Sequence, residues 1–255
     1  MKLVTVALFA LLAACADPED YPPGGGGGGL PIGGNDAGVD GGSTDGGDGG
    51  KITGRVCLLI DFRQIGSLDK CDKTTADGLT VFLGTRSATT KIDGSFTIDP
   101  PQGSGFVWHV SGGLAERAVV RSAMPFGTTN VIPAMRFDRY ADLVSSNGGT
   151  FNDQEGSIVI RILKSPMGAP VANISADTTL ANNDVRLYDT ATQDVWEMTA
   201  TGKFGIAWIP SVNLTPTMPP TPTPVTLTNQ AGMELARPSV TVENQTVTYI
   251  TQEVP

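Results

Sequence analysis

The sequence is poor in the side chains from which enzymes usually build reactive sites. One histidine, His109, and three cysteines occur among 255 residues. A single histidine excludes a zinc site with two histidine ligands, and a Ser-His-Asp triad would have to be assembled around that one imidazole. His109 and Trp108 face opposite sides of a short apolar strand, so a solvent-facing or hydrogen-bonded histidine is the simpler interpretation. We therefore expect no catalytic residues, no metal and no cofactor, and predict that the protein is not an enzyme.

Basic charge is also scarce, which bears on possible partners. The chain has 17 lysines and arginines against 26 acids, a formal net charge of −9. The first 50 residues hold seven of the acids and one base, so the remainder has 16 bases and 19 acids, a balance of −3. Without a basic cluster, nucleic acid is not an expected partner. The carboxylate pairs Asp138/Asp142 and Asp153/Glu155 lie in a polar stretch, where solvation explains them.

The N-terminus has the pattern of an export signal. A lysine precedes an apolar run over residues 3–12, which is shorter than the roughly 20 residues that a membrane-spanning helix needs. Residues 12–15 read Leu-Ala-Ala-Cys, which resembles the lipobox of bacterial lipoproteins. The resemblance implies that 1–14 is a cleaved signal peptide and that Cys15 is lipidated and anchors the protein to a membrane. Ala16 favours the outer membrane by analogy with enterobacterial sorting. An ordinary signal peptide with an incidental cysteine is the alternative.

A glycine-rich segment follows the lipobox. Residues 24–50 contain 15 glycines in 27 positions, with four aspartates between them. Glycine loses the most backbone entropy on ordering, and few apolar side chains are present to offset that loss. We predict a disordered Gly/Asp-rich linker over 15–50, with a root-mean-square span of roughly 30–35 Å. Calcium binding by the Asp-Gly pairs is the less favoured interpretation, because no glutamate is available to close a calcium loop.

Two cysteines remain once Cys15 is assigned to the lipid. An even number in an exported protein favours a disulfide between Cys57 and Cys71. Closing a loop of about 15 residues would stabilise the fold by roughly 3 kcal/mol. A redox or metal pair is less favoured, because the spacing is not Cys-x-x-Cys and no histidine lies near in the sequence.

The rest of the chain repeats one pattern of strands. Each half opens with an alternating apolar strand, continues with a second short strand, and then has a turn glycine followed two residues later by phenylalanine. Gly94 and Gly202 lie 108 residues apart, and so do Phe96 and Phe204. Asp-Gly between alternating hydrophobic residues favours a hairpin, because its turn needs positive φ. Short strands rich in Val, Ile and Thr predict antiparallel β-sandwiches.

Three motifs point to a family. Gly-Arg-Val at 54–56, Gly-Leu-Thr-Val at 78–81 and Asp-Gly-Ser-Phe at 93–96 resemble motifs of the carboxypeptidase regulatory-like domain. The resemblance implies a seven-stranded, transthyretin-like sandwich, which we expect over 51–138, with a divergent second copy over 155–255. The predicted fold class is thus all-β: two tandem transthyretin-like antiparallel β-sandwiches after a disordered tether.

Residues 139–154 are expected to connect the two modules, with one or two helical turns at the start. Some adhesin modules of this general shape carry Lys–Asn isopeptide crosslinks. Lys51 with Asn130, and Lys164 with Asn244, hold loosely similar places. Surface charge and turn amides explain these four residues more simply.

Three tryptophans are the remaining candidates for ligand contacts. Trp108, Trp196 and Trp208 would suit a sugar-binding face if exposed, although tryptophan is more often a core residue. We predict a non-enzymatic, lipid-anchored cell-envelope protein that presents β-sandwich modules for structural or adhesive interactions with an envelope protein or polysaccharide. The alternative is a glycan-binding accessory module beside a separate hydrolase. A deep cleft that held His109 against a carboxylate would instead favour a hydrolase.

Overall fold

Strands dominate the fold, as the alternation of apolar and polar residues predicts, and the all-β prediction is confirmed. The computed structural model describes the residues named at the end of this paragraph, which lie in one compact unit. The predicted signal peptide, Cys15 and the tether lie outside them. Only two short helices, η1 and α1, occur in this part of the chain. The described ranges are 50–70, 76–113, 118–127, 129–149, 154–165, 168–181, 185–192, 194–214 and 222–255.

The first half is a sandwich of seven strands, the number that the family resemblance implies. One face joins β4, β1 and β7, and the other joins β3, β2, β5 and β6, with β6 also reaching β7. All pairs are antiparallel except β1 with β7. The strands are β1 (Ile52–Leu59), β2 (Leu79–Leu83), β3 (Arg86–Thr89), β4 (Ser95–Ile98), β5 (Val107–Gly112), β6 (Val119–Pro125) and β7 (Val131–Arg136).

The Asp-Gly turn has a different role from the predicted hairpin. Gly94 has the positive φ of +78° that the turn requires, but β3 pairs with β2 and β4 pairs with β1. The turn therefore carries the chain from one sheet to the other. Phe96 then lies buried opposite Gly54, where a Cβ would come within 2.4 Å of the phenylalanine ring. This close approach explains why the first strand carries glycine at that position.

The second half repeats the central pairings of the first. β8 pairs parallel with β17 and antiparallel with β12, as β1 pairs with β7 and β4. The remaining strands form the edge β10–β11, a three-stranded sheet β15-β14-β9 and the pair β13–β16. The strands are β8 (Glu155–Lys164), β9 (Ile174–Asp177), β10 (Leu187–Asp189), β11 (Trp196–Glu197), β12 (Ile206–Asn213), β13 (Pro222–Pro224), β14 (Thr226–Asn229), β15 (Glu234–Ala236), β16 (Ser239–Thr241) and β17 (Thr246–Val254).

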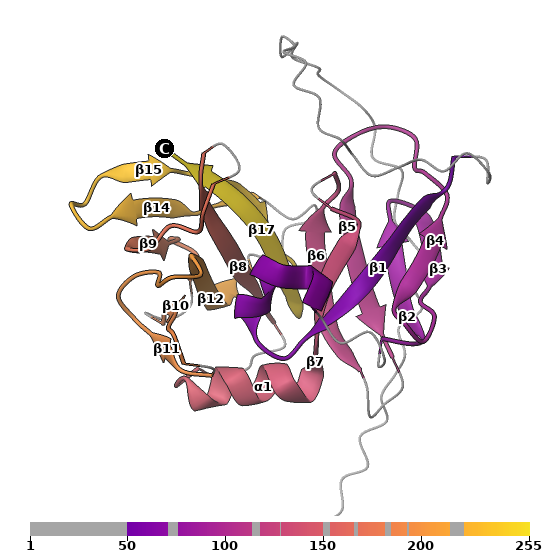
Figure 1. The fold of residues 1–255 in the computed structure, drawn as a ribbon, viewed down its shortest axis with the longest axis horizontal. Coiled ribbons are helices and arrows are strands. Elements are labelled where there is room, and N and C mark those ends of the chain that lie inside the picture. Colours follow the sequence, from indigo (N-terminus) through magenta and orange to yellow (C-terminus); the bar gives the residue numbers. More distant parts are fainter. Residues whose placement is uncertain are drawn as a thin grey trace, which may run out of the picture. The chain divides into compact units, whose positions relative to one another are not determined.

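The two halves share a sheet and a core. β17 of the second half pairs parallel with β6 of the first, which joins the strands into one twelve-stranded sheet. One hydrophobic cluster extends from the first half to Val159, Trp208 and Tyr249 in the second, while a separate cluster lies within the second half. Figure 1 shows η1 (Phe62–Lys70) and β17 in the middle of the unit, between strands of both halves. The repeats are thus fused side by side, a feature that the tandem interpretation did not contain.

The expected helical turns between the modules are present as α1 (Phe137–Ser146). Asp138 and Asp142 are exposed, as a solvated stretch predicts. The opposite face of the helix is buried through Tyr140, Leu143 and Val144, which belong to the shared cluster. The connector therefore contributes to the core in addition to linking the repeats.

Candidate functional site

The chain forms a tight turn where β1 ends and η1 begins, and this turn faces the second half. The Asp61 carboxylate accepts the backbone N–H of Arg63 at 2.8 Å, a local Asx-type bond that starts the helix. The Gln64 side-chain oxygen accepts the N–H groups of Ile60 at 2.8 Å and Asp61 at 3.4 Å. These local bonds fix the direction in which the Arg63 side chain leaves the turn.

Arg63 connects the halves through a buried network, which we call the η1 clamp: Asp61 and Arg63 with the carbonyls of Thr190 and Thr192. Its Nε donates to Asp61 Oδ1 at 2.8 Å, and its Nη2 forms an ion pair with Oδ2 of the same carboxylate. Its Nη1 donates to the Thr190 carbonyl at 3.2 Å and to the Thr192 carbonyl. The side chains of Arg63 and Asp61 are 8% and 5% exposed. Such bidentate, charge-assisted bonds fix geometry as well as adding energy.

The clamp sets the charge state of Asp61. Burial acts to raise the pKa of this carboxyl, but hydrogen bonds from Arg63, the Arg63 charge and the Asp194 N–H outweigh burial and hold the pKa below its usual value. Asp61 is therefore ionised at neutral pH, and its charge is matched by the guanidinium.

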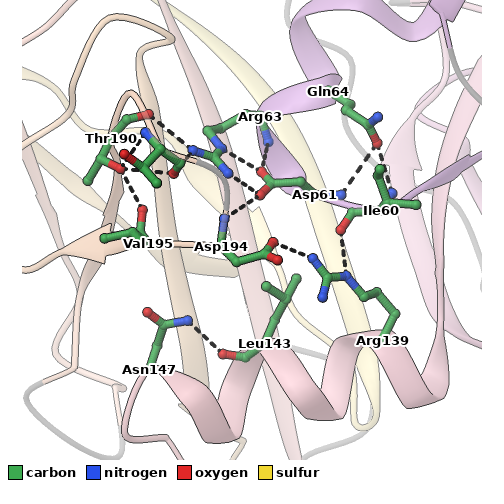
Figure 2. Close-up of polar contacts among 11 residues, drawn as sticks. Ile60, Asp61, Arg63, Gln64, Arg139, Leu143, Asn147, Thr190, Asp194 and Val195 are labelled. Carbon is green, nitrogen blue, oxygen red and sulfur yellow. Dashed lines mark hydrogen bonds and ion pairs between the residues drawn. The ribbon is translucent and has the colours of Figure 1, made fainter.

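A second, more exposed ion pair lies beside the clamp in Figure 2. Arg139 on α1 donates from Nε to the Ile60 carbonyl at 2.6 Å and pairs through Nη2 with Asp194. The Asp194 N–H in turn donates to Asp61 at 3.2 Å. Asp194 has a positive φ of 61°, an uncommon backbone state for a residue other than glycine. Helix α1, η1 and the loop before β11 are thereby tied together.

Beneath the clamp, one phenylalanine links aromatic rings from four elements. Phe62 is fully buried, and its ring centroid lies 4.9 Å from Trp208, 6.0 Å from Tyr249, 6.3 Å from Trp196 and 6.4 Å from Tyr140. All four contacts are edge-to-face, a favoured aromatic arrangement. Burial raises the pKa of Tyr140 to about 12, so its hydroxyl stays protonated.

The tryptophan prediction requires a correction. Trp108, Trp196 and Trp208 are 0%, 8% and 0% exposed, so they cannot form a sugar-binding face. Trp108 packs against Phe96 and Phe126 in the first half, and the other two belong to the ring cluster around Phe62. Their rings fill the core because a small sandwich has few other side chains of that volume.

His109 joins a second contact between the halves. It is half-buried on the β5 face opposite to that of Trp108, as predicted, and its Nε2 lies 3.0 Å from Glu243 Oε1. The hydrogen bond from His109 lowers the pKa of Glu243, and burial opposes that shift less strongly. No hydroxyl contacts His109 in the described ranges, and neither partner lines the cavity described next. The pair thus lacks the nucleophile of a triad.

A cavity of about 270 Å³ opens at the edge of the clamp. Ile60, Asp61, Arg63, Gln64 and Ser67 line it from the first half, and Ala191 and Phe204 line it from the second. Polar groups of both halves face this space, which is large enough for a small chemical group. Nothing in the sequence singled out its residues, because the segment between Cys57 and Cys71 was considered only for a disulfide.

The other predicted sites are not brought together. Cys57 is buried on β1, and Cys71 lies outside the described residues, so their disulfide stays a prediction. The Asn130 carbonyl bonds Arg55, four residues from Lys51, or about 13 Å along a strand.

The two residues of the second possible crosslink, Lys164 and Asn244, are also far apart. Lys164 lies opposite Val254, at the far end of β17 from Asn244. All four side chains of the two proposed pairs are exposed. The isopeptide alternative is therefore not supported in either half.

Neither a cluster of metal ligands nor a membrane-spanning helix is found within the described ranges. No group of three or more His, Cys, Asp or Glu side chains there is placed to hold a metal ion. None of the helices found there is long and apolar enough to cross a bilayer.

Comparisons with known proteins give no family. No family model and no curated protein sequence matches the chain. Among solved structures, the shaft pilin SpaA from Lactobacillus rhamnosus GG is 10% identical with a TM-score of 0.24, over 80% of this chain and 97% of the pilin. The Bacillus anthracis TIE protein is 10% identical (TM-score 0.23, 80% and 34% covered), and a streptococcal ancillary pilin is 11% identical (0.24, 80% and 68%). TM-scores this low carry no argument, so function is inferred from the residues alone.

Proposed function

We propose that this chain is a non-enzymatic, lipid-anchored protein of the bacterial cell envelope that presents one rigid β body for structural or adhesive contacts. The N-terminal pattern ending in Cys15 supports the anchor. The glycine-rich tether would place the folded body roughly 30–35 Å from the lipid surface. The proposal also includes Cys15 as the first residue of the mature chain and the outer membrane as its location. It further includes the descent of both repeats from a carboxypeptidase regulatory-like domain.

The fusion of the two repeats is the observation that carries the proposal. Parallel pairing of β6 with β17, the shared hydrophobic cluster and the η1 clamp all cross between the halves. Two modules joined only by a flexible linker would move independently, whereas buried charge-assisted bonds and shared rings resist such movement. A rigid body transmits force and holds a binding surface in a fixed orientation.

The groups best suited to acid–base chemistry are used in this fusion. Asp61 is bonded by Arg63, His109 pairs with Glu243, and the Tyr140 ring packs in the shared core. Each of these side chains has a structural partner from another segment of the fold. Their engagement favours a structural role over catalysis.

Anchorage and display form the test. The full chain would be produced from its own start codon in a bacterium with two membranes and labelled with a clickable fatty acid. We expect label and outer-membrane fractionation for the wild type, and loss of both for Cys15→Ser. Cells that display the wild type should also attach to envelope-coated surfaces better than cells that produce Cys15→Ser. Equal labelling of the two proteins would overturn the anchor, and equal attachment would overturn the adhesive role.

A further inference from the structure

In the cavity beside the η1 clamp, the side-chain acceptors already have hydrogen-bond partners, whereas several side-chain donors do not. Both oxygens of the Asp61 carboxylate are occupied, because Oδ1 accepts the N–H and Nε of Arg63 and Oδ2 accepts Arg63 Nη2 and the Asp194 N–H. The Gln64 side-chain oxygen already accepts two backbone N–H groups. Since each such oxygen has two lone pairs, the carboxylate and amide acceptors of the lining are filled.

The hydrogen-bond donors of the same lining are not all used. In the part of the chain that the structure describes, the Gln64 Nε2 amine and the Ser67 hydroxyl have no hydrogen-bond partner. Arg63 uses four of its five N–H groups, which leaves one on Nη2. Ser67 is brought to the wall by a kink, because it leaves helical geometry inside η1 with φ −148° and ψ 59°. A group that enters this cavity therefore meets donors that need an acceptor.

The charge and the walls narrow the ligand further. Arg63 and Asp61 neutralise each other, and the Lys203 ammonium lies 4.7 Å from the centroid of the Phe204 ring that lines the cavity. The buried Asp189 carboxylate, which accepts the Phe204 N–H at 2.7 Å, offsets this ammonium in the local charge balance, so Lys203 supplies a nearby cation rather than an excess of positive charge. Ile60 and Ala191 add apolar surface to the walls. Lone donors, a nearby cation and apolar walls suit a carboxylate carried on a short apolar stem.

We infer that this cavity binds the carboxylate of an acidic side chain, presented by a peptide segment of a partner protein. The inference rests on the proposed adhesive function, since it gives the displayed body a partner. A sugar acid is the less suitable occupant, because the Asp61 and Gln64 oxygens are filled and, among the lining side chains, the Ser67 hydroxyl alone could accept hydrogen bonds from its hydroxyls. One face of the Phe204 ring is also covered by Lys203, which limits stacking of a pyranose. The volume of about 270 Å³ admits one side chain rather than a folded segment.

The test is an NMR titration of the ¹⁵N-labelled full chain with capped tripeptides. N-acetyl-Leu-Glu-Leu-amide should shift the side-chain amide signals of Gln64 and the backbone signals around Ser67, with a dissociation constant of about 1 mM. N-acetyl-Leu-Gln-Leu-amide has the same shape without the charge and should bind at least about tenfold more weakly. D-glucuronate forms the third arm and should produce smaller shifts than the acidic peptide.

Gln64→Glu is the decisive variant, because it keeps the oxygen that accepts from Ile60 and Asp61 while replacing the free donor with a negative charge. It should weaken binding of the acidic peptide at least about tenfold. Gln102→Glu makes the same change at an exposed position elsewhere and should leave binding unchanged.

Three results would overturn the inference: equal binding of both peptides, unchanged binding by Gln64→Glu, or no shifts at about 10 mM peptide. Larger shifts with glucuronate would also overturn it and indicate a sugar acid. None of these results would affect labelling at Cys15, so failure here is distinguishable from failure of the proposed anchor.

Discussion

The two halves of the folded unit meet in two regions that use charge differently. In the η1 clamp, Arg63 and Asp61 are almost fully buried and lie above a cluster of aromatic rings. On the exposed face of β5, a strand between β2 and β6, His109 contacts Glu243, and the two side chains are 30% and 26% exposed. Removing one partner from a buried pair leaves an uncompensated charge, whereas water replaces a lost partner at the surface. The clamp should therefore determine how the halves stay together, and the His109–Glu243 pair should add little.

The largest effect is expected from the ring that supports the clamp. Phe62→Ala removes a fully buried side chain that contacts four other rings and should cost about 3–5 kcal/mol of unfolding free energy, measured by urea denaturation. Phe82→Ala, at a residue 38% exposed in the first half, is the matched control and should cost less than about 1 kcal/mol.

Hydrogen exchange shows whether Phe62 links the halves. Because the cluster is shared, amides of β1 and β12 should lose protection together in Phe62→Ala. Loss of protection in β1 alone would mean that the halves unfold independently, and it would contradict the fused interpretation.

The next comparison is between two arginines at the contact between the halves, Arg63 and Arg139. Arg63→Met leaves Asp61 buried and unpaired and should cost about 3–5 kcal/mol. Arg139→Met removes the same group from a pair whose acid, Asp194, is 42% exposed, and should cost about 0.2–1 kcal/mol. Thermal and urea unfolding of both variants would measure the difference. Equal losses would show that burial does not separate the two pairs.

The positions of many strands along the chain could be predicted from the sequence, because alternation and turn chemistry are local. The opposite facing of Trp108 and His109 followed from a two-residue period, and the positive φ at Gly94 followed from the Asp-Gly turn. The matched spacing of Phe96 and Phe204 does not mark equivalent positions, because Phe96 is buried on β4 whereas Phe204 precedes β12 and is half-buried.

The contact between the two halves could not be predicted from such local signals. The pairing of β6 with β17 joins residues more than 120 positions apart, and a period in one strand does not name the partner on its free edge. No motif or spacing in the sequence distinguishes Asp61 and Arg63 from other charged residues. Their burial depends on the Thr190 and Thr192 carbonyls, which only the packed second half supplies. The tryptophans were misplaced as candidates for the same reason, since the shared core decides their exposure.

Acid should affect the two regions through Asp61 and Glu243. Both carboxyls have folded pKa values below their ordinary values of 3.8 and 4.5. Their contributions to stability are therefore complete above those ordinary values and are lost as pH falls through the lowered folded values. Between about pH 5 and about pH 2, wild type should lose more unfolding free energy than Asp61→Asn, and Glu243→Gln should resemble wild type more closely. If Glu243→Gln reduced the pH dependence of the unfolding free energy more than Asp61→Asn did, the expected ranking would be reversed.

The smallest effect is expected from the His109–Glu243 pair itself. A double-mutant cycle with His109→Gln and Glu243→Gln should give a coupling energy below about 1 kcal/mol, and about 0.5 M salt should reduce it further because the pair is partly exposed. A coupling as large as the loss in Arg63→Met would mean that His109, the chain's one histidine, holds the halves together as firmly as the clamp. The pairing of β6 with β17 beside this residue, rather than burial, would then explain which of the two regions contributes more to stability.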